Sequence, residues 1–496
     1  MSDMNWISIY PQVLLLVMAC VIAVVDLFIK HPQRTPTYML TQLSLAVVAG
    51  LLLRDFQSGT STVAFSNMVV NDPLSNLLGF FASVGVMVTL AYSRTYAASR
   101  EILKGELFSL SMFSLLGMLV MVSGNNVLVT YLGLEMMSLS MYALVALRRD
   151  HTVSTEAAMK YFVLGALASG FLLYGMSMLY GATGSLELPK IFAAVAQGQV
   201  NKQVLVFALV FLSAGLGFKM GAVPFHMWVP DVYHGAPTAA TLLIAGAPKI
   251  ATFGMVIRLM VGGLFGLAID WQQMFIVMAV LSLLVGNLAA IAQTNFKRML
   301  AYSTISQMGF VLLGLAGGVT GNTPDGAVGA VGAYSGAMFY VVTYVLTTLG
   351  SFGVIMMLSR AGFEADQIAD FAGLNKRNAW YAAVVTILML SLAGIPLTVG
   401  FIAKYAVLQT LVLSGSTFNL GLAIFAVVAS LIGAFYYLRV IKTIYFDPVQ
   451  DRAAIETPAD VRILMSLNAL AVVALGLFPT AVLTMCQSAI SALLVH

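Results

Sequence analysis

Five ionisable side chains lie inside long apolar stretches of this 496-residue sequence. They are Glu135, Lys160, Lys219, Lys249 and Lys404. A charged group near the centre of a lipid bilayer costs at least about 2.5–3.5 kcal/mol, and such residues usually mark an ion or proton pathway. Lysine and glutamate can hold and release protons when burial and a neighbouring charge change their proton affinity. The residue types therefore predict a buried proton relay.

The relay has three further candidates, and one of its lysines has an alternative role. His226 and His234 flank the region that follows Lys219, and histidine titrates near neutral pH. Tyr302 is the third candidate, and it lies among polar residues within a later, otherwise apolar run. Lys160 follows Glu156 by four residues, so an ordinary ion pair at the membrane interface is the alternative to a relay role. A metal site is not expected, because no third strong ligand lies near the two histidines.

Two of the buried lysines lie close to a proline. Pro224 follows Lys219 by five residues, and Pro396 precedes Lys404 by eight. Proline disrupts the helical hydrogen-bond ladder, and broken helices at membrane depth commonly line ion sites in transporters. A passive kink is the alternative for either proline alone. A break beside a buried lysine, occurring twice, favours two functional helix breaks.

The composition identifies the elements that must hold these residues. The sequence is 60% hydrophobic and 9% charged, with a mean hydropathy of +0.95, whereas a soluble domain has about 25% charged residues. This excludes a soluble enzyme, a nucleic-acid-binding protein and a secreted disulfide scaffold. The two cysteines are too few for an iron–sulfur cluster, which usually takes about four.

Apolar runs of about 20 residues predict an all-α protein with about fourteen transmembrane helices. Membrane-spanning strands are not expected, because ten-residue alternating segments are absent. The seventh run reaches Pro224 and the twelfth contains Pro396, so both helices are predicted to be broken. The predicted spans are 6–28, 37–54, 74–93, 106–123, 126–147, 156–180, 203–223, 238–261, 270–293, 299–318, 330–358, 379–410, 418–446 and 462–493.

Basic residues in the connections predict the orientation. Because Lys and Arg accumulate in cytoplasmic connections, the odd-numbered connections are predicted to be cytoplasmic, and both termini are predicted to lie on the other side. The odd-numbered connections hold fifteen basic residues: Lys30, Arg34, Arg94, Arg100, Lys104, Arg148, Arg149, Lys297, Arg298, Arg360, Lys376, Arg377, Lys442, Arg452 and Arg462. The even-numbered connections hold four: Arg54, Lys190, Lys202 and Arg258.

The two broken helices predict an internal repeat. Spans four to eight and spans nine to thirteen would form two five-helix units, with spans seven and twelve in corresponding places. Lys219 and Lys404 correspond only loosely, and Glu135 has no carboxylate counterpart in span ten. The predicted regions are a three-helix region at 1–105, a first five-helix unit at 106–261, a second at 270–446 and a C-terminal helix at 447–496.

Three stretches of the sequence form a specific combination. They are FKMGAVPFHMWVPDVYHGAPTAATLLIAGAPKI at 218–250, TNFKRMLAYSTISQMGF at 294–310 and LAGIPLTVGFIAKY at 392–405. The combination resembles the proton-pumping membrane subunits of NADH:quinone oxidoreductase (respiratory complex I), which are related to Mrp-type cation/proton antiporter subunits. The form PDVYHGAPT followed by APKI resembles the subunit N branch of that family, whereas the other two large subunits tend to carry a WLPDAH-type stretch.

The resemblance implies a role for each buried residue. Glu135 resembles the family's helix-five glutamate, which pairs with Lys219, and Lys160 resembles a further helix-six lysine. Lys249 would be the central relay lysine, and Lys404 would lie at the exit-side half-channel. The implied protein is an enzyme subunit of the bacterial inner (cytoplasmic) membrane. It would move protons to the periplasm, where both termini would lie, and NADH-to-quinone electron transfer in partner subunits would drive it.

The resemblance also implies cofactors and partners. No cofactor is expected in this chain, because FMN, the iron–sulfur clusters and quinone would belong to partner subunits. The expected partners are the lipid bilayer and other membrane subunits of the complex, including a second antiporter-like subunit and small hydrophobic subunits. Nucleic acid is not expected.

Two alternatives to this function stay open at the level of sequence. A stand-alone or Mrp-like sodium/proton antiporter would need oxygen ligands for a hard cation, but lysines repel cations and Glu135 is the one clearly buried carboxylate. A passive membrane assembly scaffold would use its polar residues only to hold helices together. Substitutions that abolish pumping but leave assembly intact would exclude the scaffold.

Overall fold

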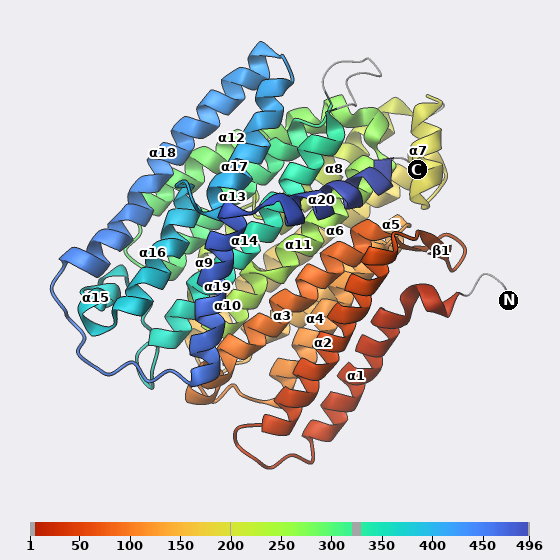
Figure 1. Cartoon of the computed structure of the whole chain (residues 1–496). Helices are drawn as coiled ribbons and strands as arrows, with labels where there is room; N and C mark the ends of the chain where they lie inside the picture. The colour runs from red at the N-terminus through yellow and green to blue at the C-terminus, as the bar shows by residue number, and fades with distance from the viewer. Residues whose placement is uncertain (1–4, 199, 320–328, 495–496) are drawn as a thin grey trace.

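The chain folds into a bundle of long helices, most of which run along roughly one direction (Figure 1). The structure is a computed structural model that describes residues 5–198, 200–319 and 329–494. The predicted positions of the termini, Met1 and His496, therefore lie outside the described residues. Helices form because, in a bilayer, each backbone polar group must be satisfied within its own segment.

Thirteen helical segments in these ranges are long and apolar enough to cross a membrane. A fourteenth crossing consists of α16 and α17, which have 15 residues each. The predicted all-α membrane fold with about fourteen spans is confirmed. The elements are η1 (Trp6–Ile9), α1 (Tyr10–Asp26), α2 (Thr35–Ser58), β1 (Thr62–Ala64), β2 (Val69–Asn71), α3 (Pro73–Ser99), α4 (Gly105–Ser123), α5 (Val127–Val145), α6 (Thr152–Thr183), α7 (Leu188–Ala196), α8 (Lys202–Met220), α9 (Trp228–Gly235), α10 (Thr238–Ala245), α11 (Ala247–Val256), η2 (Ile257–Gly263), η3 (Phe265–Leu267), α12 (Ala268–Ile291), α13 (Phe296–Ala316), α14 (Ala330–Leu358), η5 (Ile368–Phe371), α15 (Leu374–Arg377), α16 (Ala379–Ala393), α17 (Val399–Leu413), α18 (Thr417–Phe446), α19 (Ala459–Leu477) and α20 (Thr480–Leu494).

Both predicted helix breaks are present, but a glycine ends the helix in each case. Helix α8 ends at Gly221, which has a φ of 79°, and α16 ends at Gly394, which has a φ of 83°. Glycine adopts this left-handed conformation without a Cβ clash and commonly ends helices in this way. Pro224 and Pro396 lie inside the non-helical segments that follow.

Two predicted spans differ in detail from the structure. The eighth, 238–261, is one candidate membrane crossing as predicted, but Gly246 separates α10 from α11, which continues into the π-helical segment η2. Pro248 explains this break, since it has no N–H to continue the ladder of α10. The fourteenth, 462–493, divides before Pro479 into α19 and α20, and α20 packs against α14 and α3.

The connections gather at the two ends of the bundle as the span count requires. At one end, Gly124 forms a β-bridge with Val69 of the hairpin β1–β2, and Asn126 forms one with Glu187. These two β-bridges join the second, fourth and sixth connections. At the other end, Asn295 bridges to Gln367, which joins the ninth and eleventh. We call the second end the basic face, because the odd-numbered connections meet there, and the first end the opposite face. Helix α1 starts and α20 ends toward the opposite face (Figure 1).

The centre of the bundle is formed by α10, α11, α13 and α14. In the α10–α11 segment, every residue of the most apolar stretch is buried, and in α13 and in α14 94% of the residues of the corresponding stretch are buried. In contrast, α1, α18 and α19 are less than half buried and lie at the periphery. The central helices carry Lys249 and the polar residues of α13, so these side chains face protein rather than lipid.

Candidate functional site

Lys219 is connected to Glu135 through a serine. The Lys219 ammonium, 9% exposed at the end of α8, donates to Ser138 Oγ at 3.0 Å and to Ser169 Oγ at 3.5 Å. Ser169 in turn donates to Glu135 Oε1 at 2.5 Å. The predicted pair is therefore bridged by a hydroxyl, and no direct ion pair joins the two side chains in the described ranges. Glu135 itself is half-buried.

Lys249 binds the carbonyl end of the broken helix α8. Its ammonium, 3% exposed, donates to Met220 O at 2.9 Å and to Lys219 O at 3.3 Å. Trp228 lies beside it, with the ring centroid 5.3 Å from Nζ, and donates from its indole to Phe218 O at 2.9 Å. A cation is stabilised there, because the last carbonyls of a helix carry a partial negative charge.

Lys404 makes the same contact with the other broken helix. Its ammonium, 8% exposed on α17, donates to Ala393 O at 2.9 Å and to Leu392 O at 3.1 Å, the last carbonyls of α16. A third bond runs to Ser430 Oγ of α18 at 2.8 Å. Each helix break thus creates a carbonyl site for one ammonium, although the lysines come from different helices.

One small cavity lies within the Lys219–Lys249 cluster and another lies beside the Lys404 cluster. The first has a volume of about 10 Å³ and lies between Ser138, Lys219 and Lys249. The second has about the same volume and is lined by Gln307 and Tyr344, among others. One water needs about 10–15 Å³ measured in this way. A water in the first cavity would place a proton carrier between the two lysines.

A polar cluster on α13 connects to Lys404. Gln307 donates at 3.1 Å to Leu392 O, the same carbonyl that Lys404 binds, and also donates to Tyr437 OH at 3.1 Å. Tyr340 donates to Gln307 Oε1. Three helices therefore contribute hydroxyl or amide groups to one buried network beside the second cavity.

Tyr233 is a buried tyrosine beside Trp228 and Phe352. It is fully buried on α9, which packs against α13, and its ring lies 6.2 Å from that of Trp228. Its hydroxyl makes no hydrogen bond in the described ranges. A buried polar group normally has a protein or water partner. A bound water is therefore expected beside the Tyr233 hydroxyl.

Lys160 is placed by the structure in an ion cluster on the basic face. Its side chain is 43% exposed and pairs with Glu156 at 2.8 Å and with Asp231 at 2.9 Å. Asp231 also pairs with Arg298 at 2.8 Å, so the cluster joins α6, α9 and α13. These contacts match the interfacial pair and add a second acidic partner that the sequence does not reveal. They do not connect Lys160 to Lys219 or Lys249.

The other relay candidates are not brought together. His226 is half-buried, and its Nδ1 has no partner in the described ranges, whereas His234 lines a separate cavity at the basic face. Tyr302 is half-exposed and makes no side-chain hydrogen bond with the described residues. Its neighbours Ser303 and Thr304 face inward instead, toward Tyr437 and Tyr344. In the described ranges the tenth span therefore contributes Ser303 and Thr304 to buried polar contacts, and a relay role of Tyr302 stays a prediction.

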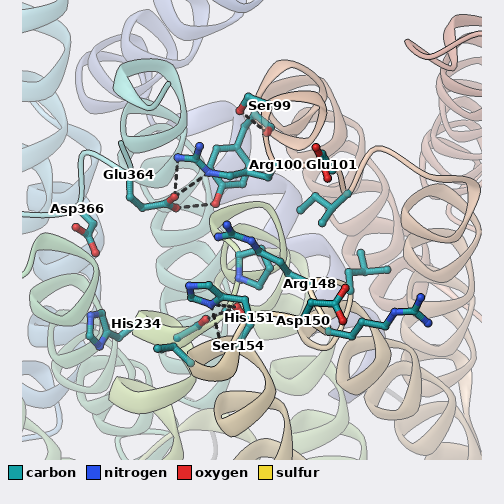
Figure 2. Close-up of a pocket in the computed structure, with 18 of the residues that line it drawn as sticks. Ser99, Arg100, Glu101, Arg148, Asp150, His151, Ser154, His234, Glu364 and Asp366 are labelled. Carbon is teal, nitrogen blue, oxygen red and sulfur yellow. Dashed lines mark hydrogen bonds and ion pairs between the residues drawn. The ribbon is translucent and has the colours of Figure 1, made fainter. Parts of the chain in front are cut away.

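The large cavity at the basic face has a volume of about 830 Å³. Figure 2 shows residues around it from the end of α3, from the α5–α6 connection, from α9 and from the 359–367 connection. Its lining includes Arg148, His151, His234 and Lys297. The cavity ends at the turn between α9 and α10, where Lys297 donates to Ala236 O at 2.8 Å. Water from this face can thus reach the turn between α9 and α10.

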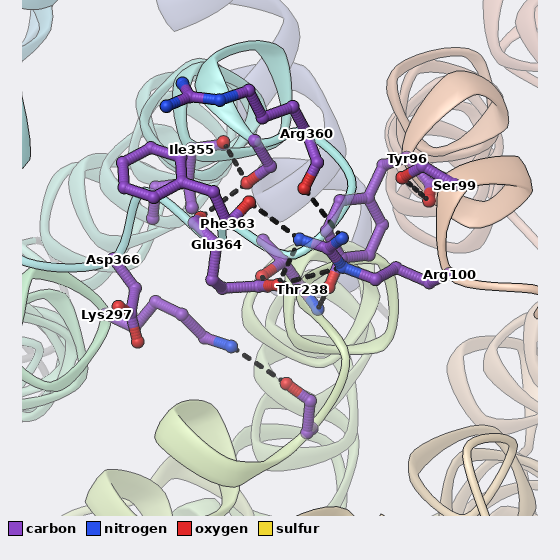
Figure 3. Close-up of polar contacts among 12 residues, drawn as sticks. Tyr96, Ser99, Arg100, Thr238, Lys297, Ile355, Arg360, Phe363, Glu364 and Asp366 are labelled. Atoms are coloured by element: carbon purple, nitrogen blue, oxygen red, sulfur yellow. Dashed lines mark hydrogen bonds and ion pairs between the residues drawn. The ribbon is translucent and has the colours of Figure 1, made fainter. Parts of the chain in front are cut away.

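Glu364 holds this turn in place (Figure 3). Its carboxylate pairs with Arg100 at 2.9 Å and accepts from Tyr96 and Thr238 at 2.6 Å each. Burial opposes ionisation, but Lys297, Thr238, Tyr96 and Arg100 outweigh it and hold the pKa of Glu364 below its usual value. The carboxylate therefore stays ionised and fixes Thr238, the first residue of α10.

Several of the contact residues could not be found from the sequence. Ser138, Ser169 and Ser430 bind the lysines, but a serine in an apolar helix is common and usually bonds its own backbone. Gly221 and Gly394 could have indicated where the two helices end, and the residue before each glycine supplies a carbonyl that binds a lysine. Within the described ranges, no group of three or more His, Cys, Asp or Glu residues could hold a metal ion.

Comparison with known proteins gives consistent matches. Residues 124–433 match the family model described as NADH:quinone oxidoreductase/Mrp antiporter, TM. NADH-quinone oxidoreductase subunit N of Polaromonas naphthalenivorans (strain CJ2) is 58% identical over 496 residues, covering 99% of this chain and 98% of that protein. Subunit N of Herminiimonas arsenicoxydans is 57% identical and covers 99% of both.

Solved structures agree with these sequence matches. A chain of respiratory complex I from Thermus thermophilus superposes with a TM-score of 0.80 at 30% identity, over 96% of this chain and 98% of that one. A chain of the Mrp complex from Dietzia sp. DQ12-45-1b has the same fold, with a TM-score of 0.82 at 20% identity, over 99% and 98%.

Proposed function

Because this chain belongs to the NADH-quinone oxidoreductase subunit N family, the antiporter-like membrane subunits of a proton-translocating oxidoreductase complex, we propose that its buried lysines are the proton carriers. The route runs from Lys219, with Glu135 beside it, through Lys249 to Lys404. The observation that supports it most is the pair of ammonium groups bound to the carbonyl ends of two broken helices. A charge placed there can leave as a proton without breaking a salt bridge.

The serine link supplies the switch in this proposal. When Ser169 connects Glu135 to Lys219, the carboxylate stabilises the charged lysine. When movement of α5 or α6 breaks the link, Lys219 loses this stabilisation and its proton affinity falls. The proton then passes through the first cavity to Lys249 and on toward Lys404. Electron transfer in partner subunits would drive the movement.

The proposed switch predicts different effects for two neighbouring serines. Ser169→Ala removes the hydroxyl that joins Glu135 to Lys219, and it should lower NADH-driven proton transport about five-fold, the factor that one hydrogen bond of about 1 kcal/mol supplies. Ser138→Ala is the matched control, because it removes a bond to Lys219 without breaking the link to Glu135. Proton uptake by reconstituted vesicles, normalised to assembled complex, measures both. Equal pumping by the two variants would contradict the switch.

We also propose an orientation, a membrane and partners. The basic face would be cytoplasmic, the opposite face periplasmic and the membrane the bacterial inner membrane, as the distribution of Lys and Arg supports. FMN, the iron–sulfur clusters and quinone would be bound by partner subunits. The chain would contact a second antiporter-like subunit and small hydrophobic subunits, and the half-buried Glu135 supports a protein partner on that side.

Labelling of single cysteines tests the orientation. In a variant without Cys20 and Cys486, a cysteine at Lys376 should resist a membrane-impermeant reagent in intact spheroplasts, whereas one at Thr60 should react. Both positions are in connections, on the basic and opposite faces respectively. Permeabilised cells provide the control for reactivity. Reaction at position 376 alone in intact spheroplasts would reverse the proposed orientation.

A further inference from the structure

Two arginines occupy equivalent positions in the two proposed five-helix units. Arg258 follows Lys249 by nine residues on the last helix of the first unit, and Arg439 follows Ser430 by nine on the last helix of the second. Lys249 and Ser430 are themselves equivalent, since Lys249 donates to Met220 O of α8 and Ser430 to Ala393 O of α16. The final helices of the two proposed units therefore make matching contacts with the broken helices at these positions.

The arginines also make the same contact. Arg258 donates at 2.9 Å to Val122 O, in the last turn of α4, the first helix of its unit. Arg439 donates at 2.8 Å to Ile291 O, the last residue of α12, the first helix of its unit, and at 2.6 Å to Gln293 O. A unit of five helices crosses the membrane an odd number of times, so the second unit is inverted relative to the first. The two arginines therefore lie toward opposite faces.

Arg439 lines a cavity at the basic face. The cavity has a volume of about 260 Å³ and is lined by Arg439 together with Thr443, Asp447 and Gln450. It opens at the end of α18, next to the ninth and eleventh connections. Arg439 is half-buried, and its Nε makes no hydrogen bond with the described residues.

Behind Arg439, polar groups continue inward to Lys404. Tyr436, one turn away on α18, donates to Asn287 Oδ1 at 3.1 Å, and Asn287 donates to Ala429 O at 2.9 Å. The next residue, Ser430, accepts from Lys404. This path would connect Lys404 to the basic face, whereas the proposed function needs Lys404 to release its proton toward the opposite face.

We propose that Arg439 is a fixed positive charge that prevents protons in this cavity from reaching Lys404. Arginine stays protonated in proteins, so it cannot relay a proton, and its charge repels one. Arg258 differs in this respect, because its charge is compensated by Asp72 at 2.6 Å, so the barrier is assigned to Arg439 alone. This inference rests on the proposed function, because it takes Lys404 as a proton carrier.

Passive proton flux through the assembled complex tests the barrier. Complex containing Arg439→Gln is reconstituted into liposomes without NADH, and a potassium diffusion potential set by valinomycin drives protons toward an internal pH-sensitive dye. Glutamine keeps a donor for the Ile291 and Gln293 carbonyls but loses the charge, so passive flux should rise about ten-fold. Arg439→Lys keeps the charge and should stay close to wild type. The double variant Arg439→Gln/Lys404→Met should also return to the wild-type flux.

A second variant gives the same comparison if the glutamine substitution prevents assembly. Arg439→Cys can be modified through the cavity with a cationic or a neutral methanethiosulfonate of similar size, and only the cationic reagent should stop the leak. No rise in flux without the charge, or an equal rise with Arg439→Lys, would overturn the barrier. A leak that persists in the double variant would show that it bypasses Lys404. Failure of the proposed function would appear separately, as normal NADH-driven pumping by Lys404→Met alone.

Discussion

Lys219→Arg is expected to leave the complex assembled but to lower NADH-driven proton transport about ten-fold or more, as for loss of an acid–base group. The guanidinium keeps the positive charge and can bind Ser138 and Ser169, the present partners of the ammonium. It cannot release a proton at any pH in the working range, because arginine stays protonated in proteins. A structural cation could thus be replaced here, but a proton carrier could not. Proton uptake by vesicles normalised to assembled complex is the measurement.

Two further variants separate the charge of Lys219 from its size. Lys219→Met has a similar length without the charge, and it should pump no better than the arginine variant. Glu135→Gln keeps the side-chain shape and can still accept from Ser169, but it no longer stabilises a charged lysine, so coupling should fall as well. Wild-type pumping by Lys219→Arg would show that charge alone suffices, and the carrier role of Lys219 would then have to be withdrawn.

The number of spans and their alternation could be predicted, because each crossing requires an apolar run of a set length. The details that failed depend on how single residues act in the packed bundle. The eighth span reads as one apolar run that contains Pro248, and a proline in such a run is compatible with a kink as well as with the full break found at Gly246. The hairpin β1–β2 was not predicted, because strands of three residues leave no alternating pattern.

The buried lysines could also be found from the sequence, because a charge in an apolar run is rare. Their partners could not, since Lys249 and Lys404 bind backbone carbonyls, which every residue carries. Lys219 and Lys404 correspond only loosely between the two predicted units, because the shared feature is the carbonyl that is bound and not the position of the lysine in the sequence. By position relative to Gly221 and Gly394, Lys404 corresponds to Asp231, and Lys249 performs the equivalent contact in the first unit.

This difference between the units has a physical consequence. The end of a broken helix offers one carbonyl site to an ammonium, and the chain fills that site from α11 in the first unit and from α17 in the second. A carrier at this site is stabilised by dipoles rather than by a carboxylate, so losing its proton leaves no unpaired buried anion. What matters for transport is then the position of the ammonium, not the helix that carries it.

Lys404→Met is therefore expected to lower NADH-driven proton transport about ten-fold or more, and a lysine at Ser430 should restore part of it. Ser430 is the equivalent of Lys249, so in Lys404→Met/Ser430→Lys the new ammonium can reach Ala393 O from α18, as Lys249 reaches Met220 O from α11. Lys404→Met/Ser430→Met is the matched control, because it changes the same two positions without supplying a proton carrier. Lys404→Arg separates the carrier from a helix cap, since it keeps a cation near the carbonyls but does not release a proton. Full pumping by Lys404→Arg would leave Lys404 only a structural role. Recovery in Lys404→Met/Ser430→Lys but not in its methionine control would show that transport requires a titratable ammonium at the carbonyl end of α16.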